Sequence, residues 1–67
     1  MRKRTKIICT LGPASSSAKV ISNLIKEGTD VFRINLSHSS IEQTAKIIHV
    51  IKSASLKQGR PVATLVD

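Results

Sequence analysis

The side chains best suited to chemistry in this 67-residue chain lie at the ends of two short apolar runs. Arg33, Asn35 and Ser37 alternate at the end of one run, and Asp67 follows another. Alternate residues of a strand point to the same face, so the first three side chains are expected to lie together. An inward arginine needs an anion or a carboxylate partner. Amide, hydroxyl and carboxylate oxygens are hard ligands, which suit an alkali or alkaline-earth cation better than zinc.

Several of the candidate residues also have a purely structural interpretation. Arg33 is open to a role as a salt-bridged or snorkelling strand residue. His38 falls in a serine-rich loop and His49 on a helix surface, so the two histidines predict no metal site. Cys9 lies in an apolar strand with no base nearby in the sequence, which favours a small core residue over a reactive thiol.

Three strands and two helices must position these residues. Apolar runs at 5–11, 30–36 and 62–67 predict the strands. The first helix is expected between the serines at 15–17 and Gly28, with one apolar stripe made of Val20, Ile21, Leu24 and Ile25.

The second helix is expected to span about 18 residues before Gly59. Its start has two possible capping boxes, Ser39 with Glu42 or Ser40 with Gln43. The periodicity places Ile41, Ala45, Ile48, Ile51 and Ser55 on one face of this helix.

The order β-α-β-α-β predicts three parallel, neighbouring strands. Parallel sheets need cover on both faces, and two helices can cover only one side of a sheet or the outside of an incomplete barrel. Ligands of α/β folds bind at the carboxyl ends of the strands. The strand ends beginning at Thr10 and Arg33, together with Asp67, place the unusual polar residues on that one rim.

Composition narrows the class of protein and the location. Eleven Lys and Arg against four Asp and Glu give a formal charge of +7, which favours an anionic partner such as nucleic acid or a phosphorylated metabolite. No apolar run is long enough for a membrane span or a signal peptide, and the single cysteine agrees with a cytoplasmic location. With one aromatic residue and no disulfide, the chain is expected to be part of a larger fold.

Residues 5–15 have the sequence T-K-I-I-C-T-L-G-P-A-S, and residues 31–38 have the sequence V-F-R-I-N-L-S-H. These two motifs, in register, resemble the amino-terminal part of pyruvate kinase. The approach from Arg60 to Asp67 extends the resemblance over nearly the whole chain. The resemblance implies an α/β fold in which residues 1–67 form a β-α-β-α-β segment of a (β/α)8 TIM barrel. The barrel would be incomplete, without the inserted small domain, the remaining barrel units or the carboxy-terminal domain.

The resemblance also implies an activity: phosphoryl transfer from phosphoenolpyruvate to ADP, giving pyruvate and ATP in glycolysis. Family enzymes use magnesium and usually potassium, and the intact enzyme is expected to be a homotetramer. Arg33 would contact the substrate phosphate, and the potassium ligands would be Asn35, Ser37 and Asp67.

The nucleotide would be contacted or bordered by Asn35, His38, Thr10 and Pro13. The magnesium carboxylates and the lysine that aids phosphoryl transfer have no counterpart in these 67 residues. The resemblance therefore gives the chain no catalytic residue, and the chain alone is expected to be inactive.

The sequence departs from the family pattern at two places. Ser39 stands where the family usually has glycine. A backbone conformation with positive φ, which glycine adopts readily, is therefore expected to be altered at this position. Residues 29–32 also differ from the family beside Arg33.

Two other readings stay open. One is a small basic module that binds nucleic acid or phosphate, although no nucleotide-binding loop motif is present and nucleic acid is not the expected partner. The other is a fragment that pairs its open strand edges with a partner chain.

Overall fold

The computed structural model describes residues 5–12, 17–38 and 40–67. It contains β1 (Ile8–Leu11), α1 (Ala18–Lys26), β2 (Val31–Ile34), a 3-10 helix (Leu36–His38), α2 (Ile41–Gln58) and β3 (Ala63–Val66). The predicted order of strands and helices is confirmed. Each strand has four residues and is shorter than the apolar run that predicted it.

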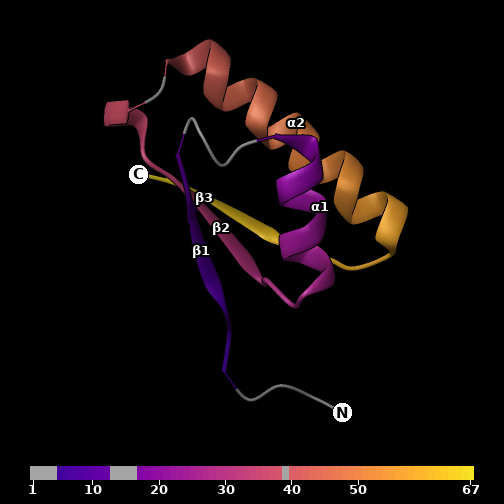
Figure 1. Cartoon of the computed structure of the whole chain (residues 1–67). Coiled ribbons are helices and arrows are strands. Elements are labelled where there is room, and N and C mark those ends of the chain that lie inside the picture. Colours follow the sequence, from indigo (N-terminus) through magenta and orange to yellow (C-terminus); the bar gives the residue numbers. More distant parts are fainter. Residues whose placement is uncertain (1–4, 13–16, 39) are drawn as a thin grey trace.

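The three strands form one parallel sheet in the order β1-β2-β3, as expected. Thr10 of β1 is level with Arg33 of β2, and Arg33 is level with Leu65 of β3. Both helices lie on the same side of this sheet (Figure 1). The unit therefore has one covered face and one uncovered face.

Ser17, the third of the three serines, is the N-cap of helix α1. The Ser17 hydroxyl accepts a hydrogen bond from the Val20 amide at 3.3 Å, which satisfies one of the unpaired donors of the first turn. Ile21 and Ile25 are fully buried, Leu24 is half-buried against the core, and Val20 is half-buried. The predicted apolar stripe is confirmed.

Helix α2 begins with the second of the two possible capping boxes. Ser40 and Gln43 exchange side-chain hydrogen bonds with each other's backbone amides, both at 3.1 Å. The alternative cap, Ser39, lies outside the described residues. The helix spans 18 residues and ends at Gly59, whose φ of 63° is the left-handed conformation that glycine adopts readily.

The face of α2 that the periodicity singles out is only partly buried. Ile51 is buried and Ile48 and Ser55 are half-buried, but Ile41 is 81% exposed and Ala45 is exposed. The residues actually buried are Thr44, Ile47, Ile51 and Ala54. Apolar residues occur around much of this helix, so its sequence does not fix which side faces inward. Packing against α1 and the sheet selects the row at intervals of three and four residues.

Buried and exposed side chains alternate along β2, which distinguishes the two faces of the sheet. Phe32 and Ile34 are fully buried beneath the helices, whereas Arg33 between them is exposed on the other face. On that uncovered face Ile8 is 60% and Leu65 is 52% exposed. The helix layer thus leaves Arg33 on an uncovered face that also carries large apolar side chains.

No helix in the described part of the chain is long and apolar enough to cross a membrane.

Candidate active-site rim at the carboxyl ends of the strands

The main contact at the rim joins Arg33 of β2 to Asp67, the residue that follows β3. The Arg33 guanidinium donates through Nη2 to Asp67 Oδ2, forming an ion pair between two partly exposed side chains. The backbone holds the same two strand ends together. The Asp67 amide donates to the Ile34 carbonyl, and the Leu36 amide donates to the Asp67 carbonyl, each at 2.9 Å.

Asn35 and Ser37 also lie in contact, through a turn. Asn35 Oδ1 accepts hydrogen bonds from the Ser37 amide at 2.9 Å and from the Ser37 hydroxyl at 2.7 Å. Such a side-chain-to-backbone turn is typical of asparagine after a strand. The expectation that strand alternation extends to Ser37 is wrong, because β2 ends at Ile34 and the 3-10 helix follows. Turn geometry brings these two oxygens together.

Thr10 lies beside Arg33 in the neighbouring strand and is exposed. The structure therefore places Thr10, Arg33, Asn35, Ser37 and Asp67 along the same end of the sheet. Pro13 lies outside the described residues. His38 ends the 3-10 helix, and its side chain also lies outside the described part.

The specific pairing of Arg33 with Asp67 was not predicted from the sequence. The sequence indicates an anion or a carboxylate beside Arg33, but it indicates only a cation beside Asp67. The available signal was topological: both residues stand at the ends of strands that the β-α-β order makes neighbours. A strand-end arginine and an acid at the next strand end are the pattern that could have revealed the pair.

The oxygen atoms of the rim are hard ligands, of the kind that alkali and alkaline-earth cations favour over zinc. Asn35 Oδ1 and the Ser37 hydroxyl are already neighbours, and the Arg33 bond engages only Oδ2 of the Asp67 carboxylate. Residues 5–12, 17–38 and 40–67 contain no group of three or more His, Cys, Asp or Glu side chains placed to hold a metal.

Cys9 and His49 have the structural positions expected of them. Cys9 packs against the core, with its sulfur 3.2 Å from the Thr29 hydroxyl. His49 is exposed on α2. Neither residue belongs to the rim.

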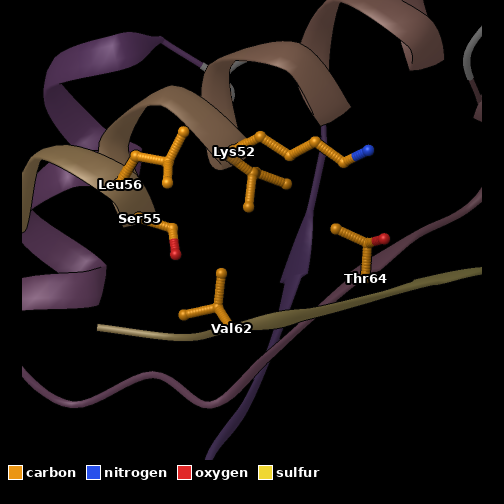
Figure 2. Close-up of a pocket in the computed structure, with 6 residues that line it drawn as sticks. Lys52, Ser55, Leu56, Val62 and Thr64 are labelled. Atoms are coloured by element: carbon orange, nitrogen blue, oxygen red, sulfur yellow. The ribbon is translucent and has the colours of Figure 1, made fainter. Parts of the chain in front are cut away.

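A hollow of about 270 Å³ lies apart from the rim, between α2 and β3. Figure 2 shows Leu56 and Ser55 of the helix above Val62, with Lys52 extending toward Thr64. Thr64 is level with the buried Phe32, so this hollow opens on the helix side of the sheet, opposite Arg33. Its lining is mainly apolar, and it includes none of the predicted site residues that the structure describes.

Comparison with known proteins identifies the family. Residues 2–67 match the family model described as pyruvate kinase, barrel domain. The chain belongs to the pyruvate kinase family. It is an incomplete β/α segment of that barrel, which confirms the fold class predicted from the sequence.

Curated relatives named pyruvate kinase match almost the whole chain. The protein of Methylorubrum extorquens is 46% identical over 65 residues, which is 97% of this chain and 14% of that protein. The protein of Geobacillus stearothermophilus is 42% identical over 67 residues, 100% of this chain and 11% of its own length. That of Thermococcus litoralis is 45% identical over 64 residues, 96% of this chain and 14% of its own. The chain therefore spans between a tenth and a seventh of these relatives.

Proposed function

We propose that these residues supply the phosphate-contacting and potassium-binding part of a pyruvate kinase active site, in an enzyme that transfers phosphate from phosphoenolpyruvate to ADP. The observation that carries the proposal is the Arg33–Asp67 ion pair at the carboxyl ends of adjacent parallel strands. This is the end of a β/α barrel where active sites are built. The family match favours this reaction over other reactions in which phosphate is bound or transferred.

Arg33 is proposed to hold the phosphate of phosphoenolpyruvate. A guanidinium has five N–H donors in a planar fork, and only Nη2 is engaged with Asp67. The remaining donors suit phosphate oxygens, which arginine can bind in a bidentate manner. Asp67 restrains the fork at the rim, so that less side-chain freedom is lost when the anion binds.

Asn35, Ser37 and Asp67 are proposed to hold potassium. A bound cation would add positive charge beside the phosphate that moves, and phosphoryl transfer depends on such neutralisation. The backbone bonds between Asp67 and β2 fix the height of the carboxylate relative to Asn35. Magnesium would be held by carboxylates of the complete enzyme outside this segment.

The nucleotide is proposed to pass along the same rim, bordered by Thr10 and Asn35, with His38 and Pro13 as further contacts from the family pattern. Thr10 is exposed beside Arg33, which is consistent with this path. We also propose that the intact protein is a homotetramer located in the cytoplasm.

A hybrid enzyme tests the function directly. In the Geobacillus stearothermophilus pyruvate kinase, the aligned segment is replaced by residues 1–67 of this chain, all of which are covered by the match. The hybrid is expected to convert phosphoenolpyruvate and ADP in a coupled assay, whereas the same enzyme lacking the segment is not. A hybrid with the parent's oligomeric size and thermal transition but no turnover would refute the proposal.

In the hybrid, Asp67→Asn is expected to raise the half-saturating potassium concentration about 5- to 30-fold, the equivalent of about 1 to 2 kcal/mol. The substitution removes the only formal negative charge among the three proposed ligands. The backbone bonds of residue 67 do not depend on its side chain, so the strand end should keep its place. Potassium activation curves at saturating phosphoenolpyruvate provide the measurement.

Glu42→Gln is the matched control, because it removes one exposed carboxylate in the first turn of α2. Its potassium curve should coincide with that of the unsubstituted hybrid. A change in the KM for phosphoenolpyruvate with an unaltered potassium curve would mean that Asp67 acts through Arg33 and is not a cation ligand.

A further inference from the structure

A second hollow lies between α1 and α2, and no rim residue contributes to it. Its volume is about 350 Å³, within the size range of small-molecule sites. We call it the interhelical groove. Small apolar side chains of both helices line part of it: Ala18, Val50 and Ala54. The rest of its lining is polar or basic.

The polar lining forms two rows that follow helical spacing. His49, Ser53 and Lys57 are four residues apart along α2, so they share one face of that helix. Lys19 and Ser22 are three residues apart on α1 and likewise share a face. The two rows therefore line one groove from opposite helices.

Hydrogen bonds between the two βα units hold this groove in place. Gln58 at the end of α2 donates through Nε2 to the Ser22 carbonyl at 2.8 Å and to the Ser22 hydroxyl at 3.0 Å. Arg60 donates to the Lys26 carbonyl at 3.1 Å. The helices are thus fixed relative to each other before any ligand arrives, which lowers the entropic cost of binding.

The charge of the groove has one sign. Lys19 and Lys57 are exposed, and neither forms an ion pair with any other residue that the structure describes. No Asp or Glu contributes to the lining. Lysine ammonium groups offer three donors each, and the serine hydroxyls add further hydrogen-bonding groups.

We propose that the interhelical groove is a binding site for a small organic phosphate. The phosphate would be held by Lys19 and Lys57, and the apolar part of the ligand would lie over Val50 and the two alanines. The combination of a few polar groups with an apolar floor is typical of small-molecule sites. A long polyanion would instead be attracted to basic residues all over the surface, without preference for the groove.

Lysine acetylation in the hybrid enzyme tests this proposal residue by residue. The probe is phenyl phosphate, compared with inorganic phosphate and phenol, and acetylation rates are read by mass spectrometry. At ten times its dissociation constant, phenyl phosphate should slow acetylation of Lys19 and Lys57 about tenfold. Lys46 and Lys52, which are exposed on α2 outside the groove, should react at unchanged rates. Inorganic phosphate should protect only at higher concentrations, and phenol not at all.

Two double variants complete the test. Binding of phenyl phosphate, measured by calorimetry in the presence of saturating phosphoenolpyruvate, should lose its groove component in Lys19→Gln/Lys57→Gln. It should keep that component in Lys46→Gln/Lys52→Gln, which has the same net charge. Equal protection of all four lysines, equal potency of inorganic phosphate, or no protection at any concentration would each overturn the proposal. The readout does not require turnover, so a folded but inactive hybrid still decides it.

Discussion

Arg33→Lys in the hybrid enzyme is expected to lower kcat/KM for phosphoenolpyruvate about 10- to 150-fold. Lysine keeps the positive charge but loses the planar fork, and with it a charge-assisted hydrogen bond of about 1.5–3 kcal/mol. Each 1.36 kcal/mol of lost transition-state stabilisation reduces the rate tenfold. Lysine has fewer N–H donors than arginine, and one of them would also be needed by Asp67, the partner of Arg33. Steady-state kinetics with varied phosphoenolpyruvate give the measurement.

Arg60→Lys is the control for this substitution. Arg60 precedes β3, at the opposite end of the strand from Asp67, and its described side-chain bond is to the Lys26 carbonyl. Its replacement should change kcat/KM by less than about twofold, because its described contact is far from the rim and lysine can still donate to the same carbonyl. If Arg33→Lys and Arg60→Lys give the same kinetics, Arg33 is a structural residue and the phosphate assignment fails.

The 67-residue polypeptide on its own is expected to show neither pyruvate kinase turnover nor a cooperative unfolding transition. The sheet has helices on one face only, while the other face exposes Ile8 and Leu65. Every residue of β3 is exposed. Parallel sheets are stable when both faces are covered, and open strand edges favour aggregation.

Circular dichroism during heating and size-exclusion chromatography at several concentrations measure the folding of the polypeptide, and a coupled assay measures its turnover. Broad or absent thermal transitions and concentration-dependent association are expected. A sharp transition of a monomer with dispersed amide NMR signals would contradict the folding prediction. Turnover that persists after contaminating host enzyme has been removed would contradict the other.

Sequence patterns predicted the elements of the fold well where the stabilising interactions join residues within one or two turns of each other. Ser40 with Gln43 was one of two capping boxes that the sequence predicted, because both partners of each box lie within one turn. The stripe of α1 was correct because its flanking residues are polar. The buried side of α2 could not be identified from its periodicity, because Ile41 and Ile47 are equally apolar and only packing on α1 and the sheet distinguishes them.

The sequence predicted where the candidate site lies, but it did not predict which side chains contact each other there. Parallel topology places Arg33 and Asp67 at one rim, and the structure confirms that neighbourhood. The Asn35–Ser37 contact arises from a turn whose start cannot be located to one residue from β propensity. The reaction itself came from the resemblance of two motifs, because oxygen ligands and one arginine are compatible with many phosphate chemistries.

Cys9 gives the chain a natural reporter of helix docking. It is the only cysteine of the sequence, it sits half-buried on the helix side of β1, and its sulfur contacts Thr29 between α1 and β2. A thiol in that position becomes reactive when α1 separates from the strand, as local opening exposes groups that the packed state protects. The alkylation rate of Cys9 would therefore report the free energy of that opening, both in the short polypeptide and inside a complete barrel. The logarithm of the ratio of the two rates would measure how strongly the rest of the barrel stabilises its first βα unit.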